Sequence, residues 1–203
     1  MPALAHHLLT QAYNNAWANH RLLGACAQLS AADFGAPRVG FFPSLRATLN
    51  HILTVDCFYL GALERELRGE APDPQAYEDC FAVDQPFQDC AGLAAAQREA
   101  DRRLLAYCAA QRSDAELQRP VTVLRPGGRV QVDTRLRLLA HLFQHQIHHR
   151  GQVHAMLAGT PLAPPQLDEF YCAGEASLRA ADFAALGWTE AAIWGAGSDT
   201  TRA

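Results

Sequence analysis

The chain of 203 residues carries little charge and no strong excess of either sign, because charged residues make up 19% and the formal net charge is -4. Proteins that bind nucleic acid or anionic membranes electrostatically present a positive face, so neither partner is expected here. No apolar run approaches the length of about 20 residues that spans a bilayer. Hydrophobic residues make up 49%, which is typical of a soluble globular protein with one domain and room for an appendage.

The sequence has six cysteines but none of the cysteine patterns that define a structure. No two of them form a CxxC pair, and their wide scatter does not resemble a disulfide framework. No apolar leader typical of secretion stands near the beginning. We therefore expect a cytoplasmic protein whose thiols stay reduced. Cys26 and Cys57 fall in apolar helical stretches, where small buried hydrophobes are favoured over metal ligands.

Hydrophobic periodicity predicts four long helices, at about residues 4–29, 44–68, 86–111 and 134–159. Ser44 is expected to cap the second, and Asp133 or Thr134 the fourth. Segments 121–123 and 130–132 flank a Pro-Gly-Gly turn and predict a small β-hairpin before the fourth helix. Residues 69–84 are expected as a loop, and Ser113 to Glu116 as a capping box before a short turn.

Beyond the fourth helix, residues 160–165 are expected to be extended, with short helices at about 175–186 and 189–194. Residues 195–203 are expected to be disordered. We predict two units, a bundle over residues 1–160 and an extension over 161–203 that packs on the bundle and covers one mouth of the site described below.

The second predicted helix is apolar around most of its circumference. Such a helix is central in a bundle or buried against another subunit, and we predict both, hence a homodimer. Asp56 is its exceptional residue, since a buried carboxylate needs a partner. An ion pair with Arg150 or another arginine is favoured over a role in orienting a ligand.

Histidines are concentrated in the fourth helix, where five of the nine lie between His141 and His154. At about 100° per residue, His145 and His149 lie about 20° to either side of the apolar stripe through Leu138, whereas His148 lies about 80° away. Residues at this spacing have Cβ atoms about 5–6 Å apart, so the two imidazoles can share one metal. The alternative is a pair of hydrogen-bonded core histidines, which leaves more buried nitrogen atoms to satisfy.

A metal needs a third ligand, and His51 is the best candidate because it lies in the other strongly apolar helix. Phe58 and Ala62 share its direction, so His51 is expected to be covered. The HxxxH spacing lacks the glutamate of the HExxH zinc motif, so the spacing alone says little about any reaction.

The combination of motifs resembles the DinB family, also called DinB/YfiT-like, over about residues 4–160. The matching motifs are Tyr13-Asn14-x-x-Trp17-Ala18-Asn19, Asn50-His51 and His145-x-x-x-His149-Arg150-Gly151-Gln152. The resemblance implies an all-α fold, a DinB-like four-helix bundle with the β-hairpin before its last helix and a short helical C-terminal extension. It also implies a divalent metal held by His51, His145 and His149. Known relatives include transferases and isomerases that use thiols such as mycothiol or bacillithiol, and many members have no assigned reaction.

Three neutral imidazoles leave coordination positions open for water or substrate, as in catalytic sites. We expect one divalent ion per chain, with zinc or nickel ahead of iron. The predicted function is a metal-dependent enzyme acting on a small molecule, with thiol-dependent transfer or isomerisation ahead of hydrolysis. The alternative is a non-catalytic bundle in which the ion has a structural or stress-related role. Thiol chemistry predicts an open pocket with basic groups, and a structural ion predicts a closed shell.

Several polar residues are candidates for orienting the ligands or contacting substrate. They are Asn50, Tyr59, Gln144, Arg150 and Gln152, with Asn19 as a further candidate for lining the site. For Arg150, a salt bridge is favoured over contact with an anion.

Overall fold

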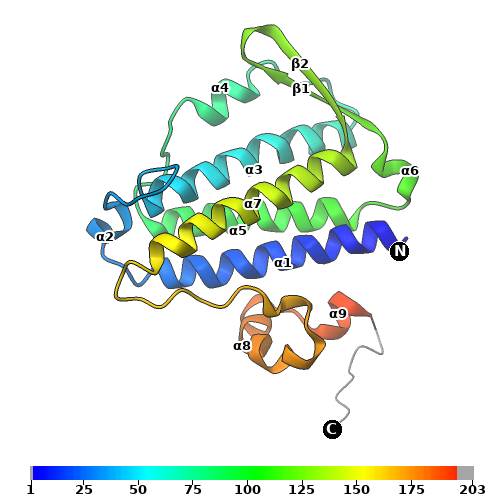
Figure 1. The fold of residues 1–203 in the computed structure, drawn as a ribbon. Helices are drawn as coiled ribbons and strands as arrows, with labels where there is room; N and C mark the ends of the chain where they lie inside the picture. The colour runs from blue at the N-terminus through cyan, green and yellow to red at the C-terminus, as the bar shows by residue number, and fades with distance from the viewer. Residues whose placement is uncertain (1, 196–203) are drawn as a thin grey trace.

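Four long helices form the body of the protein in the computed structural model, which describes residues 2–195 (Figure 1). They are α1 (Ala3–Cys26), α3 (Leu45–Leu67), α5 (Cys90–Ala109) and α7 (Arg135–Leu157). Helix α1 packs against α5 and α7, and α3 packs against the same two helices. The predicted four-helix bundle is confirmed. The expected disorder of the tail concerns residues 196–203, which lie outside the described residues.

Side-chain caps fix where the two histidine-bearing helices begin. Ser44 Oγ accepts a hydrogen bond from the backbone N–H of Ala47 at 3.0 Å, and Thr134 Oγ1 accepts one from Arg137 at 3.2 Å. These contacts satisfy N–H groups that the first turn of a helix leaves unpaired. Ser44 was predicted as a cap from the sequence, and Thr134 was one of the two predicted alternatives, with Asp133.

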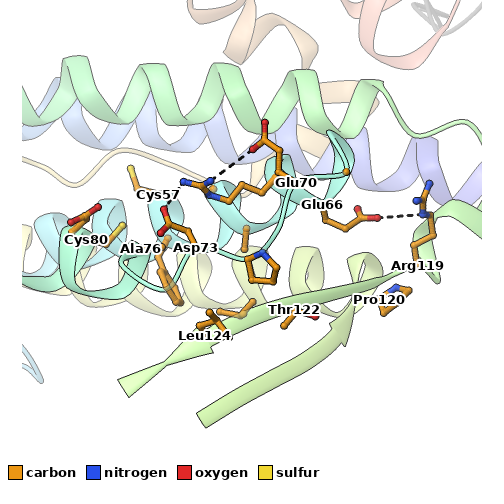
Figure 2. A pocket seen from close by; sticks show the side chains of 18 residues that line it. Cys57, Glu66, Glu70, Asp73, Ala76, Cys80, Arg119, Pro120, Thr122 and Leu124 are labelled. Atoms are coloured by element: carbon orange, nitrogen blue, oxygen red, sulfur yellow. Dashed lines mark hydrogen bonds and ion pairs between the residues drawn. The ribbon is translucent and has the colours of Figure 1, made fainter. Parts of the chain in front are cut away.

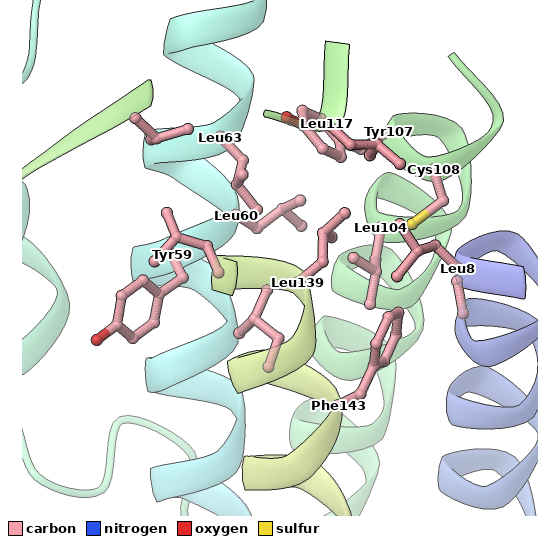
Figure 3. Packing of buried hydrophobic residues seen from close by; sticks show 14 of the residues in the cluster. Leu8, Tyr59, Leu60, Leu63, Leu104, Tyr107, Cys108, Leu117, Leu139 and Phe143 are labelled. Carbon is pink, nitrogen blue, oxygen red and sulfur yellow. The ribbon is translucent and has the colours of Figure 1, made fainter. Parts of the chain in front are cut away.

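The bundle core draws apolar side chains from all four long helices (Figure 3). Leu8 of α1, Leu60 of α3, Leu104 of α5 and Leu139 of α7 are at most 5% exposed. Leu117 closes this end of the core from α6 (Asp114–Leu117). A second apolar cluster continues towards α2 (Ala31–Gly35), so the histidines lie on a continuous packed scaffold.

The predicted hairpin is present as strands β1 (Pro120–Arg125) and β2 (Arg129–Thr134), paired antiparallel with Pro120 opposite Thr134. The turn between them, η1 (Pro126–Gly128), has positive φ at Gly127 and Gly128, a conformation that favours glycine. Val121 and Val123 are buried, so β1 packs on the bundle while the hairpin feeds directly into α7.

Two local expectations are wrong. The predicted loop at 69–84 contains helix α4 (Ala76–Phe81), because Tyr77 and Phe81 pack against Phe58 of α3 with ring centroids 5.6 and 5.5 Å away. Helix α5 begins at Cys90 rather than near Pro86, because Asp89 caps it. The segment before α5 is held by hydrogen bonds from Asn50 of α3 to the backbone of Phe87, described with the metal centre.

The apolar circumference of α3 is explained within one chain, because α4 and β1 cover the side that the neighbouring bundle helices leave open. Its central position therefore accounts for the pattern, and the homodimer stays a prediction. No helix among residues 2–195 is long and apolar enough to cross a membrane.

The C-terminal segment packs against α1, on the side of the bundle away from the hairpin (Figure 1). It comprises η2 (Glu169–Tyr171), η3 (Ala173–Glu175), α8 (Ala176–Leu186) and α9 (Glu190–Trp194). Phe170, Phe183 and Ile193 enclose Trp17 of α1. Arg21 adds ion pairs to Asp182 at 2.6 Å and Glu169 at 2.8 Å, which hold the segment on the bundle.

Candidate metal centre

Three histidines from α3 and α7 lie close together between the two helices. His51 Nε2 lies 3.0 Å from His145 Nε2, and one ring nitrogen from each of His51, His145 and His149 falls within 4.8 Å of the others. The His145 and His149 ring centroids are 4.4 Å apart, as expected for neighbours one turn apart on a helix. The structure therefore brings together the three residues that the sequence singled out.

The local environment keeps these imidazoles neutral. Burial, with His149 as a lesser cause, lowers the pKa of His51 to about 4. Burial, followed by repulsion from His149 and His51, lowers the pKa of His145 to about 3. Burial also lowers the pKa of His149, against the opposing effect of its hydrogen bond to Gln152. Neutral rings keep a nitrogen lone pair available to a cation at neutral pH.

The donor set fits a divalent metal. Two nitrogens bound to one tetrahedral zinc at about 2.0–2.1 Å lie about 3.3 Å apart, close to the observed 3.0 Å between His51 and His145. His149 Nδ1 lies 2.8 Å from Gln152 Oε1, which fixes the proton on Nδ1 and leaves Nε2 for an ion. His145 Nδ1 is buried without a hydrogen-bond partner, so the protein alone does not satisfy the cluster.

Phe42 covers one side of the cluster. Its ring centroid lies 4.3 Å from that of His51 and 5.6 Å from that of His149. A cavity of about 310 Å³ opens beside His51. Its wall consists of Phe42, Pro43, Ala47, His51, Thr54, Phe81, Val83, Asp84 and Gln85. Apart from the neutral His51, Asp84 is the one charged or titratable side chain among these lining residues, so the basic wall expected for thiol chemistry is not found in it.

Gln152 is the predicted polar candidate that the structure places directly on a histidine of the cluster. Its Oε1 pairs with His149 Nδ1, and its Nε2 lies 3.2 Å from His148 Nε2. His148 itself is exposed, as its position off the apolar stripe predicted. Gln152 thus connects a candidate ligand to the helix surface and fixes the ring orientation of that ligand.

Three other candidates lie elsewhere. Asn50 is fully buried and binds the backbone N–H and C=O of Phe87, both at 2.9 Å, which holds the segment before α5 and delays the start of that helix. Tyr59 packs edge-on against His141 and accepts a hydrogen bond from Arg125. Gln144 is exposed on α7.

Arg150 and Asn19 belong to a buried polar network rather than to the histidine cluster. The buried polar network consists of Asn15, Asn19, Asp56, Gln97, Asp101, Gln146 and Arg150. Arg150 Nη1 donates to Asn15 at 2.5 Å, to Gln146 at 3.0 Å and to Asn19 at 3.1 Å. Both asparagines donate in turn to Asp101.

The expected ion pair between Asp56 and an arginine is not formed among the described residues. Instead, the Asp56 carboxylate accepts hydrogen bonds from Gln97 and Gln146. Burial raises the pKa of Asp56 to about 8, although these two amides and the nearby Arg150 favour its ionised form. A protonated carboxyl group needs no counter-ion, so amide donors replace the expected arginine.

Sequence reasoning missed the contact of Phe42 with the histidine cluster and several members of the buried polar network. Gln97 with Asp101, and Gln146 with Arg150, are polar pairs at i, i+4 spacing on otherwise apolar helix faces, which is the signal that could have revealed the network.

Another cavity, of about 440 Å³, lies between α3, α4 and β1 (Figure 2). None of the three histidines lines it. Several of its charged side chains pair with one another, as in the ion pairs of Arg65 with Glu70 and of Arg119 with Glu66. Its size alone therefore does not make it the reactive site.

Comparison with known proteins identifies the fold and the family. The family model described as the DinB family matches residues 5–176. A crystal structure of a DinB-like protein from Bacillus cereus superposes with a TM-score of 0.52 at 17% identity, covering 74% of this chain and 90% of that one. No curated protein matches the chain. Because the family model spans most of its length, this chain belongs to the DinB family.

Proposed function

We propose that His51, His145 and His149 hold one divalent ion, zinc or nickel ahead of iron, and that the protein is a metal-dependent enzyme. The reaction proposed is transfer of a thiol to a small electrophile, or a thiol-dependent isomerisation. The observation that carries the proposal is a set of three neutral imidazoles with an open cavity beside one of them. When bound, the ion would supply Lewis acidity and lower the pKa of a thiol or water.

The cavity wall provides the groups that bind and orient a substrate. Phe42, Phe81 and Val83 offer apolar contact for a carbon skeleton. Thr54 and Gln85 add hydrogen-bonding groups, and Gln85 is held in place by Arg46 at 2.9 Å. Phe42 also excludes water from one side of the imidazoles, which strengthens electrostatic interactions inside the site.

The charge of the wall limits the choice of thiol. Asp84 would repel a carboxylate held close to the sulfur, so a neutral or cationic thiol fits the cavity better than an acidic one. Hydrolysis is the second candidate reaction, because Asp84 is a carboxylate able to accept a proton from water.

A purely structural ion is the competing explanation. A structural site closes its coordination shell with protein groups. Here His51 and His145 are only partly buried, and His51 stands in a cavity wall. These features support an open position for a substrate.

The test is a thiol-transfer assay on the untagged full chain, loaded with zinc or nickel. Cysteamine and glutathione are compared as thiols with chlorodinitrobenzene as the electrophile. We expect turnover that a chelator abolishes, that is faster with cysteamine, and that His145→Ala removes but His148→Ala keeps. Metal binding that raises the melting temperature without turnover for any of a wide set of thiols and electrophiles would instead establish the structural role.

A further inference from the structure

A third cavity, of about 420 Å³, lies between α1, α7 and residues 166–168, which precede η2. Its lining residues are Asn14, Ala18, Ile147, Arg150, Gly151, His154, Gln166, Leu167 and Asp168. The four residues from α7 follow i, i+3, i+4, i+7 spacing, which is one helix face, and this face is nearly opposite that of His145 and His149. The extension over residues 161–203 was expected to cover one mouth of the metal site, but none of its residues lines the cavity beside His51, and residues 166–168 line this cavity instead.

Arg150 brings an incompletely paired cation to this cavity. The residue is 5% exposed, and all three of its hydrogen bonds to the described residues come from Nη1. Its Nε and Nη2 groups have no such partner, and neither is among the unpaired polar atoms that are sealed from solvent. Because Arg150 also lines the cavity, the Nε–Nη2 edge is the part of the guanidinium left for a ligand.

Other arginines of the chain show what this edge of the guanidinium binds. The chain has no lysine, so all 17 of its permanently cationic side chains are arginines. In Arg103, Nε and Nη2 donate in parallel to the two carboxylate oxygens of Glu64, at 3.0 and 2.6 Å. Arg179 binds Glu190 in the same way, at 2.8 and 3.0 Å. A planar carboxylate matches this pair of donors, and in Arg150 the same pair lacks a carboxylate.

The rest of the wall suits a small amphipathic ligand. Ala18, Ile147 and Leu167 are apolar, and Asn14 Oδ1 is enclosed without a hydrogen-bond partner. A Cβ added at Gly151 would meet nothing within 4 Å, so this mid-helix glycine leaves the cavity open. Asp168 is exposed, accepts a hydrogen bond from Gln166 at 2.5 Å, and opposes an anion.

We propose that this cavity is a second ligand site that binds a small monocarboxylate with an apolar body. The carboxylate oxygens pair with Nε–H and Nη2–H of Arg150, and the carbon skeleton packs against Ile147 and Leu167. A single negative charge is favoured over two, because Asp101 already receives hydrogen bonds from the asparagines that bind Arg150 and supplies part of its counter-charge. The site does not depend on the proposed reaction at the histidines.

Binding is tested by nuclear magnetic resonance on the isotope-labelled full chain, with and without zinc. Benzoate is the probe, and benzamide and inorganic phosphate are the comparison ligands. We expect saturable benzoate shifts at the Gly151 amide and the Arg150 Nε–H, and affinities at least about tenfold lower for the other two ligands. Equal binding of benzamide, preferential binding of phosphate, or shifts confined to residues around His51 would overturn the proposal.

Two variants and one matched control locate the site without removing Arg150, whose loss also disturbs the core. Gly151→Leu fills the cavity and is expected to weaken benzoate at least about tenfold. Gly24→Leu is the matched control, because a Cβ there also meets nothing within 4 Å and Gly24 lies outside the cavity. Asp168→Asn is expected to strengthen binding a few-fold by removing a repelling charge. Unchanged affinity in Gly151→Leu would contradict the assignment.

Discussion

Helix α7 contributes residues to two polar clusters, the buried polar network and the histidine cluster, which differ in how their polar groups find partners. Every member of the buried polar network is at most 5% exposed, and each is hydrogen-bonded to another member. The histidine cluster is only partly buried, its rings repel one another when protonated, and His145 Nδ1 has no partner. The network satisfies its members within the protein except for one edge of the Arg150 guanidinium, whereas the histidine cluster as a whole requires a ligand from outside.

The two clusters are also physically joined. Gln146 follows His145 in the sequence, and Arg150 follows His149. Through these two side chains the network ties α7 to Asp56 of α3 and to Asn15 of α1, which fixes the rotation of α7 about its axis. The buried polar network thus positions the histidine cluster, and the following changes separate their roles.

The largest effect is expected from breaking the network. Arg150→Met removes the charge that faces the buried Asp101 carboxylate, together with the three hydrogen bonds that Arg150 donates to neighbouring amide side chains. The free energy of unfolding should fall by about 3–5 kcal/mol, measured by urea denaturation. Arg102→Met, which breaks an exposed pair with Glu99, is the control and should leave the free energy of unfolding nearly unchanged. Similar losses in both variants would show that the network is not essential to the fold.

Breaking the histidine cluster should affect metal binding more than folding. His149→Ala removes one of the three donors, so stoichiometric binding of zinc should disappear by atomic absorption while the metal-free variant stays folded. His148→Ala, which alters an exposed neighbour, should keep its metal. Loss of metal in His148→Ala alone would mean that the inward face of α7 has been misassigned.

A smaller effect is expected from the residue that orients His149. Gln152→Ala removes the acceptor on Nδ1 and should lower zinc affinity about 10–100-fold, as outer hydrogen-bond partners of metal ligands do. Competition with a chromophoric chelator measures this change. Gln144→Ala, at an exposed position on the same helix, should have no effect, and equal losses in the two variants would contradict the role of Gln152.

The most gradual effect concerns pH. The folded-state pKa of Asp56 is raised to about 8, so its contribution to stability is present at low pH and is lost as pH rises from about 4 to about 8. Asp56→Asn has no titratable group at this position. Relative to wild type it should gain up to about 1.4 kcal/mol per pH unit within that window, measured on metal-free protein. Parallel stability profiles would show that Asp56 is ionised in the core.

The parts of the structure predicted correctly rest on local rules. Helix periodicity placed His145 and His149 on one inward face, and Ser44 and Thr134 could be recognised as caps because a cap acts within one turn. The participation of His51 came from the family resemblance together with its apolar surroundings.

The errors concern contacts between distant segments. Helix α4 forms because its aromatic residues reach Phe58, and Asn50 binds Phe87 rather than a histidine. Neither contact leaves a periodic signal in the sequence. Asp56 was expected to form an ion pair with an arginine, but its partners are Gln97 and Gln146. These partners could not be predicted, because their positions relative to Asp56 depend on how three helices pack.

The central claim is that three imidazoles hold one ion, and X-ray absorption at the zinc edge tests it most directly. The account predicts one zinc per chain with nitrogen ligands at about 2.0–2.1 Å and outer scattering from three imidazole rings. A sulfur ligand at about 2.3 Å, or scattering from fewer than three imidazoles, would contradict it.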